Sequence, residues 1–240
     1  MRICVVSDVH SNLPALEAVL AAAAPYDAVW HLGDIVGYGP QPNEVIARLA
    51  GEDAIGVRGN HDAAAIGQLS VEAFNDDARE AIEWTATQLG SASREWLAEL
   101  PDRREVADFT LVHGSPRDPT WEYVFSTSAA RGNLSAFGTF HCLLGHTHVP
   151  LCFRVDDRRV ETIVPDGLPL ELDRQRRALI NPGSVGQPRD GDPRASVMVI
   201  DTDANALTWH RVEYDVRAVQ QLMRAVGLPS RLSQRLSLGI

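Results

Sequence analysis

Residues 3–10 read Ile-Cys-Val-Val-Ser-Asp-Val-His, a short apolar run that gives way to two polar side chains. A run of this length is typical of a buried strand. A helical pattern follows from about Pro14 to Ala23. The order then repeats, with expected strands over 28–32 and 54–57 and an expected helix over 42–50 between them. This β-α-β-α-β order is typical of a sheet with parallel strands.

The rest of the chain changes character. Residues 63–99 predict helices, which Pro101 ends. Short strands then predominate, over 109–112, 142–144, 151–155, 160–164, 178–180, 197–200 and 207–211. Further helices are expected over 128–137 and 215–226. We therefore expect a single domain over 1–240 of the α/β class. It would form two halves of a sandwich, with a helical insertion near 63–100 and a C-terminal tail from Leu228.

Composition excludes some classes of protein. The 22 Lys and Arg against 32 Asp and Glu give a net charge of 22 − 32 = −10, which disfavours a nucleic acid partner because duplex binding relies on basic side chains. The three cysteines lie in apolar runs, which predicts buried, reduced thiols and a cytoplasmic protein. We expect no signal peptide and no membrane partner, since no apolar stretch approaches the ~20 residues of a spanning helix.

Polar clusters follow five of the expected strands. They are Asp8 with His10, Gly33-Asp34, Gly59-Asn60-His61-Asp62, His113-Gly114, and Gly145-His146-Thr147-His148. Ligands of open α/β sheets gather beyond the carboxyl ends of the strands. Imidazole, carboxylate and amide donors suit Mn²⁺, Fe²⁺, Co²⁺ or Zn²⁺, and the lack of thiolate argues against a structural zinc site. Two ions that share one carboxylate would use the whole set.

These motifs, in this order, resemble those of the calcineurin-like metallophosphoesterase superfamily. The stretch from Asn181 to Asp190, Asn-Pro-Gly-Ser-Val-Gly-Gln-Pro-Arg-Asp, resembles its small bacterial and archaeal phosphodiesterase branch. The match runs from Asp8 to about Asp190, most of the chain. The resemblance implies a four-layer α/β/β/α sandwich with a dinuclear metal site at the carboxyl ends of the strands.

The resemblance also implies roles for the motif residues. The first ion would be held by Asp8, His10, Asp34 and His148, and the second by Asp34, Asn60, His113 and His146. Asp34 would bridge the two ions. His61 would contact the substrate phosphate and protonate the leaving group, and Asp62 would orient His61. The cofactor would be two divalent ions, Mn²⁺ first, with Fe, Zn, Co or Ni as alternatives.

Other residues carry two interpretations. Arg58 and Asn60 flank the His61 motif as candidate substrate contacts, although Arg58 also suits a structural cation. Tyr38 could line a cleft or pack a turn, and Arg189 could reach a phosphate. Trp121 is interpreted as core or loop packing and not as a platform for stacking bases. Structural roles are expected for three histidines, His31, His141 and His210.

The expected activity is hydrolysis of a P–O bond by a metal-bridging hydroxide, with a phosphodiesterase as the first hypothesis. The alternatives are a phosphomonoesterase or protein phosphatase of the same fold, or a non-catalytic metal-binding scaffold. The expected partner is a small phosphate ester, with nucleotides among the candidates. The leucines of the tail leave a homo-oligomer open.

Overall fold

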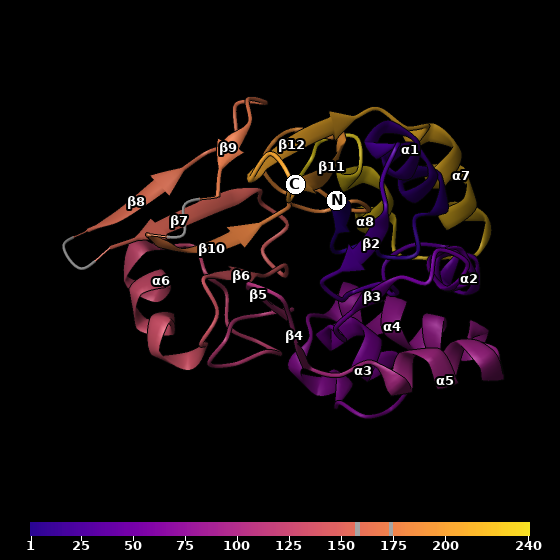
Figure 1. Cartoon of the computed structure of the whole chain (residues 1–240). Coiled ribbons are helices and arrows are strands. Elements are labelled where there is room, and N and C mark those ends of the chain that lie inside the picture. The colour runs from indigo at the N-terminus through magenta and orange to yellow at the C-terminus, as the bar shows by residue number, and fades with distance from the viewer. Residues whose placement is uncertain (157–158, 173–174) are drawn as a thin grey trace.

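The computed structural model describes residues 1–156, 159–172 and 175–240. Within them two six-stranded sheets pack face to face (Figure 1). The first has the order β3-β2-β1-β11-β12-β9 and the second β4-β5-β6-β10-β7-β8. The first sheet comprises β1 (Arg2–Val6), β2 (Ala28–His31), β3 (Ile55–Gly56), β9 (Leu170–Glu171), β11 (Ala195–Asp201) and β12 (Ala206–Val212). The second comprises β4 (Arg103–Val106), β5 (Phe109–Val112), β6 (His141–Leu143), β7 (Leu151–Val155), β8 (Val160–Ile163) and β10 (Arg177–Asn181).

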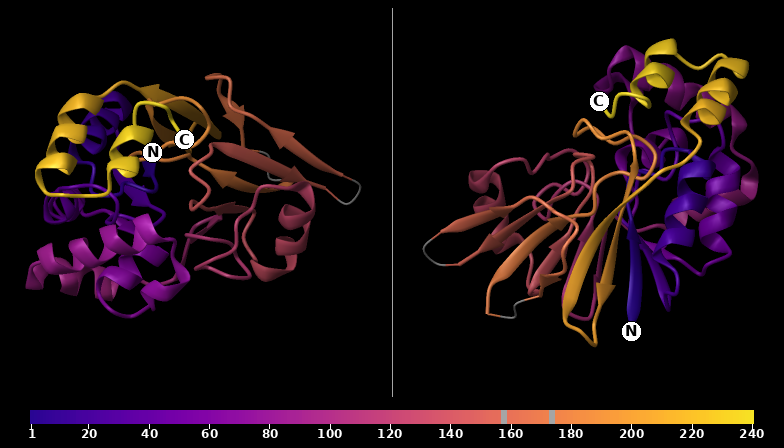
Figure 2. Two further views of the ribbon diagram at one scale, coloured as in Figure 1. Left: turned by 180° about the vertical axis from the view of Figure 1, so that it is seen from behind. Right: turned by 90° about the horizontal axis from the view of Figure 1, so that it is seen from above.

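Helices cover the outer faces of both sheets, so the expected four-layer α/β/β/α fold is confirmed. On the first sheet they are α1 (Leu13–Ala23) and α2 (Pro42–Ala50), and α7 (Val216–Ala225) lies beside them. Helix α6 (Thr127–Asn133), followed by the short η2 (Leu134–Ala136), packs on β7 and β8 of the second sheet. Figure 2 shows the indigo and purple helices of the N-terminal part outside the first sheet, with the yellow α7 beside them.

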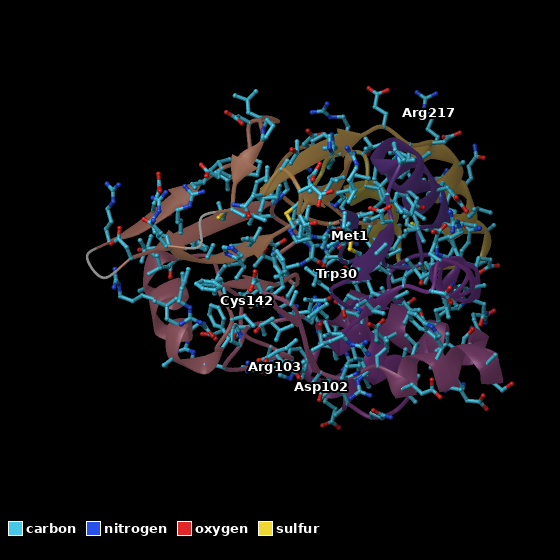
Figure 3. All side chains as sticks on the ribbon, viewed as in Figure 1. Met1, Trp30, Asp102, Arg103, Cys142 and Arg217 are labelled. Carbon is cyan, nitrogen blue, oxygen red and sulfur yellow. The ribbon has the colours of Figure 1, made fainter. Side chains whose placement is uncertain are left out.

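Alternation along β1 explains why two layers of core form. Side chains of successive strand residues point to opposite faces of a sheet. Ile3 and Val5 accordingly pack between the two sheets, whereas Cys4 and Val6 pack under the helices of the first sheet. Trp30 of β2 belongs to the core between the sheets, and Figure 3 shows it in the middle of the molecule. A strand that is buried on both faces therefore reads as one continuous apolar run.

Parallel pairing brings the functional loops to one edge. β1 pairs in parallel with β2, and β2 with β3. In the second sheet β6 is parallel to both β5 and β10. The chain leaves β1, β2, β3, β5 and β6 into the five polar clusters named above. The carboxyl ends of these strands therefore deliver the polar side chains to a shared rim.

The region 60–99 is helical, as expected, but it is divided. It contains α3 (Asn60–Ala65), the short η1 (Val71–Ala73), α4 (Asp76–Gln88) and α5 (Ser91–Glu99). Side chains interrupt it at defined points, since Asn75 caps α4 by accepting a hydrogen bond from the backbone N–H of Ala78. The division of the chain into one domain with an insertion stays a prediction.

The tail from Leu228 docks on the same chain. Helix α8 (Ser230–Arg235) lies within it. Leu228, Leu232 and Leu236 are buried against α4 and α7, whereas the side chain of Leu238 is 55% exposed. Leu228, Leu232 and Leu236 thus pack within the chain.

Two short strands, β4 and β9, were not expected from the sequence. β4 begins with three consecutive charged residues, and β9 is only two residues long. Both stand at sheet edges, where few contacts demand apolar side chains. The three cysteines are free and buried, as expected. No helix of the described residues is long and apolar enough to cross a membrane.

We expect Ile180→Ala to destabilise the protein by about 2–5 kcal/mol, because Ile180 is 1% exposed between the sheets and its truncation leaves a cavity. Urea unfolding measures the change. Val164→Ala, at a side chain 71% exposed, is the control and should stay within about 0.5 kcal/mol. A loss below about 1 kcal/mol for Ile180→Ala would contradict the assignment of this core.

Candidate metal centre

Two groups of buried ligand-type side chains lie at the shared rim. One is Asp8, His10 and His148, and the other is Asp34, His113 and His146. In each group one ligand atom from every member lies within 4.8 Å of the others. The loops after β1, β2, β5 and β6 supply them. The structure therefore brings together six of the seven predicted ligands in two clusters.

The imidazoles of the first group face each other with unprotonated nitrogens. His10 Nδ1 lies 3.1 Å from the carbonyl oxygen of Val36, and His148 Nδ1 lies 2.5 Å from that of Gln187. A carbonyl only accepts hydrogen bonds, so each Nδ1 carries the proton in a neutral ring. Both Nε2 atoms then present lone pairs, and they are 3.2 Å apart. Two lone pairs at this distance repel each other unless a cation lies between them.

The second group repeats this arrangement. His113 Nδ1 lies 2.8 Å from the carbonyl oxygen of Leu32, which directs Nε2 inward, and despite burial the charge of Asp34 raises the pKa of His113 to about 9. That atom is 3.1 Å from His146 Nδ1 and 3.1 Å from the side-chain oxygen of Asn60. Asn60, the seventh predicted ligand, therefore lies against this group. An amide oxygen, an imidazole and a carboxylate converge here on one point.

Asp34 stands between the two groups. Its Oδ2 atom is 3.7 Å from His10 Nε2 in one group and 3.3 Å from His113 Nε2 in the other. Its Oδ1 atom accepts a hydrogen bond from the backbone N–H of His61 at 2.9 Å. One carboxylate oxygen is thus within reach of both clusters, as a bridging ligand requires.

Two orphaned atoms complete the test of whether metal ions fit. Asp8 Oδ1, in the first group, is buried and has no hydrogen-bond partner, and the same holds for His146 Nε2, the ring nitrogen opposite the one that faces His113. Asp8 Oδ1 lies 3.3 Å from His148 Nε2 and 4.0 Å from His10 Nε2. Ligands about 2.0–2.2 Å from one ion lie roughly 3–4 Å from each other, so these spacings suit coordination. The residues fit a pair of divalent cations.

The electrostatics of the site favour negative carboxylates. Burial alone would raise the pKa of Asp8, but the neighbouring His148 and His113 outweigh it and hold that pKa below its usual value. The pKa of Asp34 is held well below its usual value in the same way, mainly by His113 and His61. Burial lowers the pKa of His146 to about 3 and keeps that ring neutral, as a ligand must be.

The ligand loops adopt an unusual backbone. Five predicted ligands have positive φ angles, which non-glycine residues rarely adopt: Asp8 (52°), His10 (47°), Asp34 (50°), His146 (64°) and His148 (60°). Such conformations cost on the order of 1–3 kcal/mol each and cluster at functional sites. The Ser184 hydroxyl and the Gly186 N–H both donate to the carbonyl oxygen of Asp8 and fix this loop.

The side chain of Asn181 supports the histidine loop that follows β6. Its amide donates to the carbonyl oxygen of Gly145 at 2.7 Å and to the hydroxyl of Thr147 at 3.0 Å. The stretch from Asn181 to Asp190 therefore holds the ligand loops that follow β1 and β6 through hydrogen bonds.

His61 lies beside the two groups, in the wall of the adjoining cavity. Its ring centroid is 4.9 Å from that of His10 and 4.4 Å from that of Tyr38. Gly37 has a φ of +88°, and a Cβ atom there would lie 2.5 Å from His61 Nδ1. Glycine at this position therefore leaves room for the imidazole, and the enclosed Nδ1 leaves Nε2 as the nitrogen that faces the cavity.

The described contacts of the Asp62 carboxylate are with the backbone. Its oxygens accept from the N–H groups of Gly59 and Val36, at 2.9 and 3.0 Å. The first bond caps helix α3, which begins at Asn60. Burial and the charge of Asp34 raise the pKa of Asp62 to about 7. Asp62 thus holds the loop that carries His61, and the described residues show no bond between its carboxylate and the His61 ring.

Arg58 is not brought to the site. Its guanidinium pairs with Asp102 at 2.8 Å and donates to Gln68, and it does not line the cavity beside the metal groups. The predicted contact of Arg58 with substrate gains no support, and its structural interpretation is preferred.

The cavity next to the metal groups has a volume of about 200 Å³. Its wall includes residues that sequence reasoning left undecided or missed, namely Tyr38, Phe74, Trp121, Tyr123, Arg189 and Arg235. Trp121, interpreted above as core or loop packing, lines this cavity and its ring centroid lies 5.0 Å from that of Phe74. No local pattern marks Phe74 or Arg235, because the fold alone brings their elements to the rim.

Comparisons with known proteins agree with this site. A family model described as the calcineurin-like phosphoesterase superfamily domain matches residues 1–205. The crystal structure of a metallophosphoesterase from Sphaerobacter thermophilus is 49% identical, with a TM-score of 0.91 over 100% of this chain and 99% of that one.

Two curated proteins extend the comparison. The uncharacterized protein MJ0912 of Methanocaldococcus jannaschii is 34% identical over 99% of this chain and 98% of its own length. Phosphodiesterase YfcE of Escherichia coli K12 is 28% identical over 85% of this chain and 89% of its own.

We expect Asp34→Asn to reduce the number of bound Mn²⁺ ions from two per chain to less than one, because one oxygen of Asp34 reaches both groups. Equilibrium dialysis with elemental analysis measures the stoichiometry. Asp166→Asn, which removes an exposed carboxylate, is the matched control and should retain two ions. Two ions bound at unchanged affinity by Asp34→Asn would rule out the bridging role.

Proposed function

Because the chain belongs to the calcineurin-like phosphoesterase superfamily and is a metallophosphoesterase, we propose that it hydrolyses small phosphodiesters, with a nucleotide as the substrate class. The observation that carries the proposal is the convergence of two imidazole nitrogens in each group, 3.2 and 3.1 Å apart, with Asp34 between the groups and His61 beside them. YfcE, a relative named as a phosphodiesterase, supports the choice of diesters.

Charge explains how an acidic protein would attract an anionic substrate. We propose that Asp8, His10, Asp34 and His148 hold one divalent ion, and that Asp34, Asn60, His113 and His146 hold the other. Two divalent ions would supply a local charge of about +2 after Asp8 and Asp34 are counted, and would lower the pKa of a coordinated water. The mixed oxygen and nitrogen donors favour Mn²⁺, with Fe, Zn, Co or Ni as alternatives.

His61 is proposed as the general acid. Its backbone N–H is tied to Asp34 Oδ1, so the position of its ring follows that of the bridging carboxylate. From the cavity wall its Nε2 would give a proton to the oxygen of the leaving group, and Asn60 would face the substrate beside it. Asp62 keeps the loop in place through its bonds to Gly59 and Val36.

The cavity favours a small aromatic substrate over a phosphoprotein. Its volume of about 200 Å³ accommodates a phosphate and one ring system, and not a folded protein surface. The ring of Tyr123 is stacked on that of His146, with centroids 4.0 Å apart, and Trp121 adds a further ring. Aromatic side chains of this kind stack on nucleobases. We place the enzyme in the cytoplasm because its cysteines are free and buried.

We expect His61→Asn to retain two Mn²⁺ ions and to lower kcat for bis(p-nitrophenyl) phosphate by about 10²–10⁴-fold, because only the proton donor is lost. His210→Asn, at a histidine of β12, is the matched control and should keep wild-type kcat. Full activity in His61→Asn would remove the general-acid role.

The same assay compares p-nitrophenyl phosphate with the diester. We expect the wild type to have the higher kcat/KM for the diester. Turnover of the monoester alone would identify a phosphomonoesterase. Binding of two ions without turnover of either ester would favour the non-catalytic scaffold.

A further inference from the structure

Two arginines line the cavity and have no part in the proposed chemistry. Arg189 belongs to the loop after β10, and Arg235 is the last residue of α8 in the docked tail. Elements 46 residues apart in the sequence therefore place two guanidinium groups at one cavity that also exposes Asp34 and His61. Both side chains are partly buried.

No Asp or Glu side chain forms an ion pair with either guanidinium in the described residues, although Arg235 bonds to a main-chain oxygen of Ile240, the last residue of the sequence. Arg189 donates from Nε and Nη2 to a neutral acceptor, the side-chain oxygen of Gln187, at 3.3 and 2.8 Å. Arg235 donates from Nε to the carbonyl oxygen of Ile240. These bonds orient the two groups and leave other N–H donors of each guanidinium for a ligand.

Carboxylates that follow Arg189 in the sequence are committed elsewhere. Asp190 pairs with Arg211, and Asp192 pairs with Arg194 at 2.6 Å. Asp77 lines a groove next to Arg235 without forming an ion pair with it in the described residues. An arginine that merely supported this loop would be expected to take one of these acidic partners.

The two cations also influence each other. The pKa of Arg235 is lowered by burial and, next in size, by the charge of Arg189. Two like charges beside a site that binds divalent cations destabilise the free protein. An anion bound between them would remove this repulsion, and a guanidinium is well suited to a phosphoryl group because its N–H donors match the phosphate oxygens.

The arginines are not among the candidate metal ligands, although the backbone N–H of Arg189 donates to the carbonyl oxygen of His148 at 3.4 Å. Arg189 Cζ lies 5.7 Å from the ring centroid of Tyr38, on whose ring His61 and His10 also pack, with centroid distances of 4.4 and 4.6 Å. The ring of Tyr38 therefore connects the metal ligand His10 to Arg189. A phosphoryl group at the arginines would be a neighbour of the scissile one.

We propose that Arg189 and Arg235 form a second anion subsite, which binds a phosphoryl group that is not itself cleaved. The inference rests on the proposed function and narrows its substrate class to nucleotides in which two phosphoryl groups are linked. In the hydrolysis, water adds its oxygen to one phosphorus, one P–O bond breaks, and the leaving oxygen takes a proton. The subsite holds the other phosphoryl group during this step.

The test compares two aryl esters of thymidine, one with a single phosphoryl group and one with a diphosphate between the nucleoside and p-nitrophenol. We expect Arg235→Gln to lower the ratio of kcat/KM for the diphosphate to that for the monophosphoryl ester by about 10–100-fold, the effect of losing a charged hydrogen bond. Arg235→Lys should recover part of the ratio. Arg231→Gln, on the same helix but at the outer groove, should keep it.

Binding provides a readout independent of turnover. Isothermal titration of the Mn²⁺-loaded protein with inorganic pyrophosphate and with orthophosphate should show tighter binding of pyrophosphate. Arg189→Gln and Arg235→Gln should each reduce this preference, with two ions still bound.

Equal losses on both esters, or an unchanged ratio, would overturn the second subsite. If the wild type cleaves neither ester, the proposed function fails, and the pyrophosphate titration still decides the subsite: equal affinity for the two anions rejects it. A wild type that cleaves the monophosphoryl ester but shows no pyrophosphate preference keeps the proposed function and loses this inference alone.

Discussion

Two buried carboxylates, Asp8 and Asp34, and four inward-facing imidazoles impose the constraint on which this structure depends. Buried charges are costly unless they are paired or bind a metal ion. Here the backbone carbonyls of Val36, Leu32 and Gln187 each lie against the Nδ1 atom of a histidine ring. These contacts turn the Nε2 atoms of the three rings toward the buried carboxylates. Two divalent cations would satisfy such an arrangement, and the carboxyl ends of the strands provide the edge on which it is built.

The surrounding fold holds the ligand loops in backbone conformations that are strained. Five predicted ligands have left-handed backbone conformations, each unfavourable by itself. Each ligand loop follows a buried strand, which fixes the position where the loop begins. The loop that begins at Asn181 also holds the ligand loops, through hydrogen bonds from Asn181, Ser184 and Gly186. Gly59 shows how tight this assembly is, because a Cβ atom there would lie 2.1 Å from Asp34 Oδ1. The packing that stabilises the sandwich therefore also holds the site in its conformation.

The sequence allowed much of this to be predicted. Apolar runs that end in polar clusters located the carboxyl ends of the strands, and a ligand set at those ends follows from parallel pairing. Closeness in sequence to a site motif did not place Arg58 at the site, since Arg58 adjoins Gly59 yet pairs with Asp102. Arg235, in contrast, is far from every site motif in the sequence and still lines the cavity. It stands in a tail whose leucines could equally have formed an intermolecular surface, and only their packing on α4 and α7 brings it to the cavity.

The most direct test of the account is a crystal structure of the Mn²⁺-loaded protein with anomalous scattering measured at the manganese edge. The account predicts two peaks per chain about 3.5–4 Å apart, with one oxygen of Asp34 within coordination distance of both. The first peak should contact His10 and His148, and the second His113 and His146. A single peak, or two peaks that Asp34 does not bridge, would contradict the central claim that this carboxylate organises a dinuclear centre.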